Sequence, residues 1–226
     1  MDKPVCVVIG IGPKNGRAFA TRFAKEGYAV ALLSRSTGYS SGLAEELGAK
    51  AYACDVTDPE AIERAFAQVR ADLGDVDVLL YNAGSGQFGT FDEVPDEEFE
   101  KGWKINVRGL LQSTRQVVGP MREKGQGAII VTGATASLRG KPFTAAFAQA
   151  KAAQRSLAQS FARQLGPEGI HVALVIVDGG IGTDEQTGDE GMLRPSDIAE
   201  TVYRLATQPK SAWTFETDVR PFKETW

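Results

Sequence analysis

Seven short apolar runs, separated by helix-like segments, follow one another along almost the whole chain. Near-continuous apolar strands that alternate with helices are typical of a parallel sheet whose two faces are both covered. The pattern therefore predicts an α/β fold: a doubly wound, seven-stranded and mostly parallel sheet with helices on both faces. The predicted strands are 4–10, 28–34, 49–55, 75–84, 127–133, 170–180 and 212–219; the predicted helices are 16–27, one that starts near 57, 95–118, 143–165 and 195–206.

Length and composition predict one soluble globular domain over residues 1–226, because no repeat or linker interrupts the pattern. Apolar residues make up 42% of the chain and charged residues 24%, which are ordinary values. The 29 acidic residues outnumber the 25 basic ones and no basic run occurs, which argues against nucleic acid or an anionic membrane as partner. The first strand is entered by Val5 and no apolar run approaches membrane-spanning length, so we expect a cytoplasmic protein.

A glycine-rich turn, Gly10-Ile-Gly12-Pro-Lys-Asn-Gly16, joins the first strand to the first helix. Glycines at this point allow a tight turn, and they let a pyrophosphate approach backbone N–H groups at a helix N-terminus. Lys14 and its neighbour Asn15 lie in the same turn, where the lysine would add a cation near the phosphates. The turn predicts a dinucleotide site, although a glycine-rich crossover can also be purely structural.

The end of the second strand indicates which dinucleotide is bound. A carboxylate at this position would accept a hydrogen bond from the 2′-hydroxyl of NAD and repel a 2′-phosphate. The chain instead has Ser34-Arg35-Ser36, and an arginine fork suits phosphate. The segment favours NADP(H), the alternative being a solvated arginine at a strand end.

The later part of the chain carries the candidate substrate site. Segment 179–193 is polar and follows the sixth strand, so we expect a substrate-side loop at the carboxyl edge of the sheet. Phe88, Phe143 and Phe147 would form an apolar ceiling that accepts a flat apolar substrate or closes the site. Phe147 and Lys151 are four residues apart and share one helix face. A lysine in this position can stabilise a phenolate, but phenylalanine has no proton to give.

Several motifs occur in the order and at the spacing of the short-chain dehydrogenase/reductase family, which the chain resembles over essentially its whole length. They are a nucleotide turn, an acid that faces adenine, an Asn-Ala-Gly motif, a helix asparagine, a lysine, and a threonine that contacts the nicotinamide carboxamide. In this chain these features match Gly10–Gly16, Asp55, Asn82-Ala83-Gly84, Asn106, Lys151 and Thr183. The resemblance implies a Rossmann fold, a small-molecule substrate and assembly as a homodimer or homotetramer.

The resemblance also implies roles for individual residues. Asn106 and Lys151 are the implied catalytic residues, and the lysine would also grip the nicotinamide ribose. The residues expected to bind NADP(H) are Gly10, Gly12, Lys14, Asn15, Gly16, Ser34, Arg35, Ser36, Asp55, Val56, Asn82, Ala83, Gly84, Lys151, Ile181 and Thr183.

The chain departs from the family pattern at four positions. Phe147 stands where the family has its catalytic tyrosine, and Ala134 stands where it has a serine. Asp178 replaces the usual proline after the sixth strand, and Lys14 replaces the middle glycine of the turn. In relatives the tyrosine protonates the carbonyl oxygen while hydride reaches carbon. Loss of a positioned general acid costs about 10²–10⁴ in rate, so a ketone reductase would need a substitute.

Few other residues offer a substitute proton donor. Thr135, Ser137 and Thr144 carry the nearby hydroxyls, and Ser137 is the one that we name as a further catalytic candidate. His171, the only histidine, is predicted at the far end of the sheet, and with two scattered cysteines it makes no metal site.

Three functions remain open. The first is an NADPH-dependent reductase whose substrate needs no strong acid, such as an iminium ion or an activated alkene. The second is a non-catalytic NADP(H)-binding protein that acts as a sensor or a scaffold. The third is a structural subunit that no longer binds nucleotide, which the presence of Arg35, Asp55, Asn82 and Thr183 disfavours.

Overall fold

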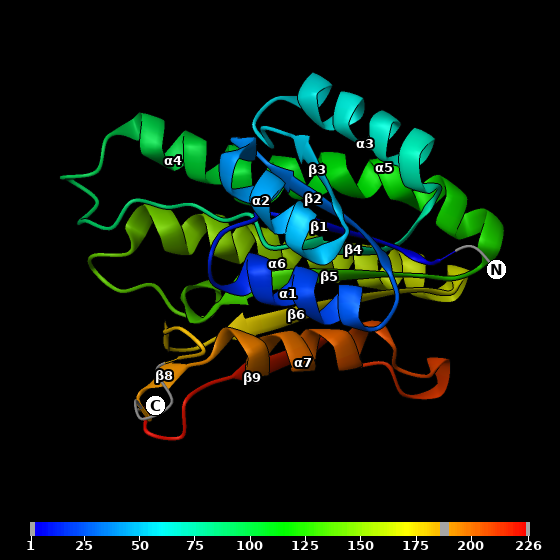
Figure 1. Cartoon of the computed structure of the whole chain (residues 1–226). Helices are drawn as coiled ribbons and strands as arrows, with labels where there is room; N and C mark the ends of the chain where they lie inside the picture. Colours follow the sequence, from blue (N-terminus) through cyan, green and yellow to red (C-terminus); the bar gives the residue numbers. More distant parts are fainter. Residues whose placement is uncertain (1–2, 186–189, 225–226) are drawn as a thin grey trace.

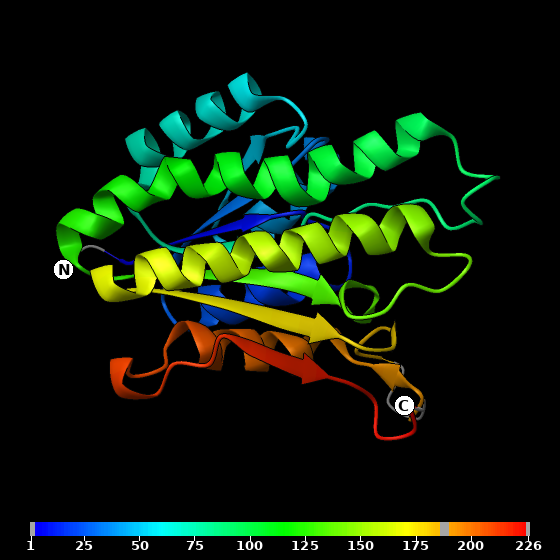
Figure 2. The same cartoon turned by 180° about the vertical axis from the view of Figure 1, so that it is seen from behind.

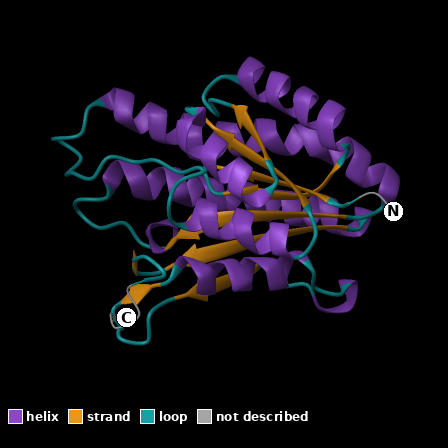
Figure 3. Ribbon diagram, in the orientation of Figure 1, coloured by secondary structure: helices purple, strands orange, loops and turns teal. Residues whose placement is uncertain are grey.

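The computed structural model describes residues 3–185 and 190–224 and contains one seven-stranded sheet (Figures 1 and 3). The strand order is β3-β2-β1-β4-β5-β6-β9, and each neighbouring pair is parallel, so the predicted doubly wound α/β fold is confirmed. The strands are β1 (Val5–Ile9), β2 (Ala29–Ser34), β3 (Lys50–Ala53), β4 (Val76–Tyr81), β5 (Gly127–Ala134), β6 (Ile170–Val177) and β9 (Glu216–Val219).

Helices cover both faces of this sheet. On one face lie α1 (Asn15–Lys25), α2 (Thr37–Leu47) and α7 (Pro195–Ala206), which Figure 1 shows in front of the strands. On the other face lie α3 (Pro59–Leu73), α5 (Gly109–Lys124) and α6 (Ala145–Leu165); α5 and α6 cross the front of Figure 2. Two separate apolar cores result, one on each face of the sheet, because both faces of a parallel strand are buried.

The helix α2 was missed by the sequence pattern. Its sequence, TGYSSGLAEEL, has two glycines and two serines, which are weak helix formers. The helix is held by tertiary packing, because Leu43 and Ala44 are buried in the same core as Phe19 and Phe23 of α1. It ends at Gly48, whose φ of 63° is the left-handed conformation that glycine adopts without strain.

The start of α3 agrees with the prediction. Asp58 caps the helix by accepting a hydrogen bond from the backbone N–H of Glu60 at 2.9 Å, and Pro59 occupies the first turn. Such a cap satisfies one of the N–H groups that a helix terminus leaves unpaired, and proline at this position sacrifices no helical hydrogen bond.

The helix predicted for 95–118 consists of three consecutive helical segments and extends six residues beyond the predicted end, to Lys124. The helix α4 (Asp96–Trp103) passes into a π-helical turn, Lys104–Arg108, and then into α5, which continues to Lys124. π-helical turns inside α-helices are rare and frequently lie at functional sites. This turn carries Asn106, which is fully buried.

Segment 179–193 contains a small parallel pair, β7 (Gly180–Ile181) and β8 (Met192–Leu193). Residues 186–189 of the predicted substrate-side loop lie outside the described ranges. Within those ranges, no helix has the length and apolar character needed to cross a bilayer.

The strand order reverses between β1 and β4. In open α/β sheets a ligand binds at such a reversal, beyond the carboxyl ends of the strands. In Figure 2 the arrowheads of β5, β6 and β9 point to the edge of the sheet where this crevice lies.

Candidate active site

Two adjoining hollows form one cleft at the carboxyl edge of the sheet. The first, of about 380 Å³, lies beyond β1, β2 and β4, and the second, of about 700 Å³, lies beyond β5 and β6. Asn82 and Gly84, which follow β4, line both hollows. The cleft thus extends from the predicted 2′-phosphate position at Arg35 to the predicted substrate position at Phe147.

The glycine-rich turn is packed tightly on one side and open on the other. Gly10 has a φ of +92°, and a Cβ atom there would lie 2.5 Å from the backbone nitrogen of Ala83. A Cβ atom on Gly16 would lie 2.6 Å from the carbonyl oxygen of Gly10, whereas one on Gly12 would meet nothing within 4 Å. Asn82 fixes the turn from β4 by donating through Nδ2 to the Gly10 carbonyl at 2.8 Å. The backbone at Gly12 is therefore open to an incoming group, as a pyrophosphate cradle requires.

The polar residues of this turn differ in what they contact. Asn15 is buried at the start of α1 and lines the larger hollow, and its Oδ1 atom has no hydrogen-bond partner within the described chain. Lys14 donates through Nζ to the carbonyl of Ile181, so it ties the turn to segment 179–193. Ile181 lines the cleft, whereas Thr183 is exposed and does not line either hollow.

Of the residues expected near the adenosine half, Ser34, Arg35, Asp55 and Val56 line the smaller hollow, whereas Ser36 lines neither hollow. Asp55 accepts from both the backbone N–H and the hydroxyl of Thr57 through Oδ1, each at 2.8 Å, and lies beside Val56. The Ser34 hydroxyl is hydrogen-bonded to the carbonyl of Ser36 and to the hydroxyl of Ser40, both at 2.9 Å. Arg35 is exposed and lines the same hollow.

Lys151 lies at the inner end of the larger hollow and is 5% exposed. Its Nζ atom donates to the carbonyl of Thr132 at 2.9 Å and to Oε1 of Gln154 at 3.0 Å. Burial lowers the pKa of Lys151 to about 8, because removing an ammonium from water disfavours its charged form.

Gly84 lines the inner end of the cleft, and the fully buried Asn106 lies behind it. Asn106 donates through Nδ2 to the carbonyls of Ser85 at 2.6 Å and Gly102 at 2.8 Å, while its buried Oδ1 atom has no partner among the described residues. A Cβ atom on Gly84 would lie 3.2 Å from Lys151 Nζ and 3.4 Å from Asn106 Oδ1. The polar ends of the two implied catalytic residues thus converge on one glycine, and a side chain at this position would crowd both of them.

The predicted apolar ceiling is present. The ring of Phe88 lies 6.4 Å from that of Phe143 and 5.5 Å from that of Phe147. Phe88 and Phe143 are 61% and 51% exposed, so these rings stand at the mouth of the hollow rather than closing it. Ala134 lines the same hollow at the end of β5. The cleft therefore has aromatic and methyl surfaces where the family pattern places a phenol and a hydroxyl.

The hydroxyl groups considered as substitute proton donors are hydrogen-bonded to other residues or lie away from the cleft. Thr135 lines the cleft but donates its proton to Oδ1 of Asp178, and Thr144 is bonded to the backbone of Lys141. Ser137 is buried, its Oγ atom has no hydrogen-bond partner among the described residues, and it does not line either hollow of the cleft. Its catalytic role stays a prediction that this position does not favour.

Two polar residues of the site gave no local signal in the sequence. Asp178, at the family's proline position, is buried in the wall of the cleft and paired with Arg220 at 3.1 Å. Gln154 lies one turn beyond Lys151 on α6 and is fully buried. Only a lysine–glutamine spacing of three, which places both on one helix face, would have pointed to it.

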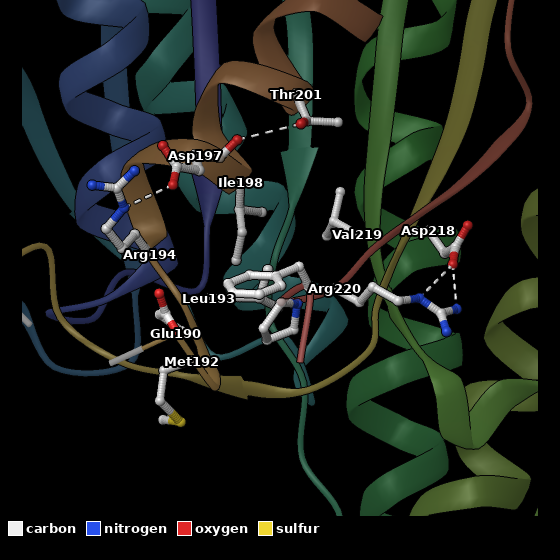
Figure 4. A pocket seen from close by; sticks show the side chains of 12 residues that line it. Glu190, Met192, Leu193, Arg194, Asp197, Ile198, Thr201, Asp218, Val219 and Arg220 are labelled. Atoms are coloured by element: carbon white, nitrogen blue, oxygen red, sulfur yellow. Dashed lines mark hydrogen bonds and ion pairs between the residues drawn. The ribbon is translucent and has the colours of Figure 1, made fainter. Parts of the chain in front are cut away.

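A third hollow, of about 600 Å³, lies between the start of α7 and the segment after β9 (Figure 4). Its floor includes Leu193, Ile198 and Val219, and no described residue lines both this hollow and the cleft. Charged side chains at its rim pair with near neighbours: Arg194 with Asp197 at 2.8 Å, and Arg220 with Asp218. These pairs leave it without the convergent polar groups that the cleft has.

We expect a pH-dependent stability difference between the wild type and a Lys151→Met variant. The pKa of Lys151 is about 8 in the folded protein and 10.5 in an ordinary environment. Below pH 8 the buried charge therefore lowers the free energy of unfolding, and this destabilisation disappears as the pH rises to 10.5. The stability advantage of the variant over the wild type should therefore shrink by up to about 3 kcal/mol across this range. Urea unfolding at pH 7 to 10.5 measures it. Lys141→Met, at an exposed position, is the matched control, and parallel curves for both variants would contradict the expectation.

The chain and its structure are similar to those of known proteins. A family model described as short chain dehydrogenase matches residues 4–190. An uncharacterised oxidoreductase of Staphylococcus aureus (strain MRSA252) is 26% identical over 223 residues, 96% of each chain. The structure is similar to alcohol dehydrogenase from the archaeon Thermococcus sibiricus complexed with 5-hydroxy-NADP, with a TM-score of 0.89, 27% identity and 99% of both chains covered. A metagenomic short-chain oxidoreductase in complex with NADP gives a TM-score of 0.87, with 27% identity and 98% of both chains covered.

Proposed function

The chain belongs to the short-chain dehydrogenase family, and we propose that it is an NADP(H)-dependent oxidoreductase that transfers hydride to a small organic substrate needing no strong general acid. An iminium ion or an activated alkene is such a substrate. The observation that carries the proposal is the combination of an intact lysine–asparagine end of the cleft with Phe147 and Ala134 in its substrate half.

The residues of the cleft fit an NADP(H) molecule. The open backbone at Gly12 and the helix N-terminus behind it suit the pyrophosphate, and Arg35 suits a 2′-phosphate. The buried amide oxygen of Asn15, which has no partner among the described residues, lies in the wall of the larger hollow, where a ligand would supply a donor. The two similar solved structures that carry NADP or 5-hydroxy-NADP support the same choice.

NADPH, when bound, supplies the hydride, and the residues of this chain hold the reactants. Lys151 would donate to the nicotinamide ribose, and the rings of Phe88, Phe143 and Phe147, which line the same hollow, would hold a flat substrate over it. Hydride addition to an iminium carbon gives a neutral amine and needs no proton at the reacting atom. Addition to an activated alkene moves charge to a distant oxygen, where other donors can meet it. Neither reaction requires a phenol at position 147.

A non-catalytic NADP(H)-binding sensor or scaffold is the second candidate, favoured by the same absence of a proton donor beside the nicotinamide position. It predicts tight binding without turnover, and a difference in assembly or partner binding between NADP⁺ and NADPH. Identical behaviour with both nucleotides would exclude the sensor.

The deciding experiment follows NADPH oxidation with a panel of ketones, activated alkenes and cyclic iminium compounds. We expect turnover of iminium ions or alkenes that exceeds turnover of matched ketones. Turnover of ketones alone would contradict the proposed substrate class, and tight NADPH binding without any turnover would favour the sensor. Assembly as a homodimer or homotetramer and a cytoplasmic location stay predictions, the first measurable by light scattering.

A further inference from the structure

The buried side chain of Gln154 connects two parts of the cleft that are far apart in sequence. Its Oε1 atom accepts from Lys151 Nζ at 3.0 Å, and its Nε2 atom donates to the backbone carbonyl of Asn106 at 3.0 Å. That carbonyl belongs to the π-helical turn Lys104–Arg108, 48 residues earlier in the chain. Gln154 is 0% exposed, so both bonds are shielded from competition with water.

The contacts around Lys151 Nζ leave it one direction in which to donate. The Thr132 carbonyl and Gln154 occupy two of its three protons, and an ammonium has no further donor. The third points towards a hydrogen-bond partner supplied by a ligand, because Lys151 lines the cleft beside Gly84. Within the described residues no carboxylate pairs with Lys151; the charged groups that line this hollow are Arg139, Lys141, Asp178 and Glu224.

We propose that Gln154 is a positioning residue, which ties Lys151 Nζ to the π-helical turn and makes this lysine a fixed hydrogen-bond donor to a bound nucleotide rather than a proton donor to the substrate. The nucleotide contact rests on the function proposed above. Amide groups are not among the side chains that shuttle protons, so the link from Lys151 to Asn106 holds the lysine without resupplying it. A lysine held in this way suits a reaction that draws no proton from this end of the cleft.

The test compares the wild type with Gln154→Glu and Gln154→Leu in the ligand-free protein. Acetylation of Lys151 by acetic anhydride, followed by mass spectrometry from pH 6 to 11, gives the midpoint at which its amine becomes reactive. A carboxylate at this position should move the midpoint up by about 1–3 pH units, since an opposite charge within hydrogen-bond distance favours the ammonium. Leucine removes an acceptor and should move the midpoint below that of the wild type. Acetylation of Lys141, at the exposed rim, should not change and is the internal control.

Shifts of the acetylation midpoint in opposite directions in the two variants would indicate a direct contact between residue 154 and Lys151. An unmoved midpoint in the Gln154→Glu variant, or movement of both variants in one direction, would overturn the proposal. If the leucine variant does not fold, Gln154→Met, which is unbranched and of similar length, takes its place.

NADPH binding separates this inference from the proposed function. Titration of the reduced nicotinamide fluorescence should show about tenfold weaker binding for Gln154→Leu, which loses both hydrogen bonds, and a smaller loss for Gln154→Glu, which keeps the acceptor for Lys151 but loses the donor to the Asn106 carbonyl. A wild type that binds no NADPH would defeat the proposed function, while the acetylation midpoints would still decide how Lys151 is held. NADPH binding with unmoved midpoints would defeat the role of Gln154 alone.

Discussion

Replacing Phe147 with tyrosine is expected to raise turnover of ketones by about 10²–10⁴ and to leave turnover of iminium substrates unchanged. The ring lies in the wall of the cleft, with Lys151 Nζ 5.9 Å from its centroid, so a phenol there would acquire a cation nearby. That cation favours the phenolate and makes the phenol a stronger acid towards a carbonyl oxygen. Steady-state rates of NADPH oxidation with a matched ketone and iminium pair measure the effect.

Phe143→Tyr is the matched control for this prediction. It adds the same hydroxyl to the same hollow, but on a ring that is 51% exposed at the mouth and stacked on Phe88. It should leave ketone turnover unchanged. Equal gains from both variants would mean that any hydroxyl in the cleft suffices, and a gain with iminium substrates would mean that proton supply limits that reaction too.

Replacing Arg35 with aspartate is expected to weaken NADPH binding by about 10–100-fold and to strengthen NADH binding. Hydrogen bonds to a charged group contribute about 1.5–3 kcal/mol, which corresponds to this range of affinity. A carboxylate at the end of β2 would also repel the 2′-phosphate and accept from a 2′-hydroxyl. Titration with each nucleotide, followed by nicotinamide fluorescence, measures both changes.

Arg115→Asp is a suitable control, because Arg115 is exposed on α5 and lines neither hollow of the cleft. It makes the same change in net charge and should leave the ratio of the two affinities as in the wild type. An unchanged ratio in the Arg35→Asp variant would place the 2′-phosphate elsewhere.

Much of the fold could be predicted from local patterns in the chain. The seven strands were found because a strand buried on both faces needs a nearly continuous apolar run, such as the one from Ile170 to Val177. The start of α3 was found because Asp58 and Pro59 form a local cap. The helix α2 was missed because its glycines and serines give no such pattern, and its burial against α1 is a tertiary effect.

The candidate site also combines residues that local sequence patterns predict with contacts that only the folded chain makes. The glycine turn, Arg35 and the Phe147–Lys151 spacing could be read from the sequence, since each depends on neighbouring residues in one strand, turn or helix face. The structure adds hydrogen bonds between residues that lie far apart in the chain. They join Gln154 to Asn106, Thr135 to Asp178, and Lys14 to Ile181, which is 167 residues away.

The sequence by itself determined the order of the seven strands and of every main helix except α2, the nucleotide turn, and the phenylalanine and alanine where the family pattern has its tyrosine and serine. Only the tertiary structure decided which polar atoms are satisfied and which are left for a ligand. A hydrogen bond between distant residues has no local periodicity, and it exists only because α6 packs against the π-helical turn on one face of the sheet. The same packing buries Lys151 at the wall of the cleft and lowers its pKa to about 8.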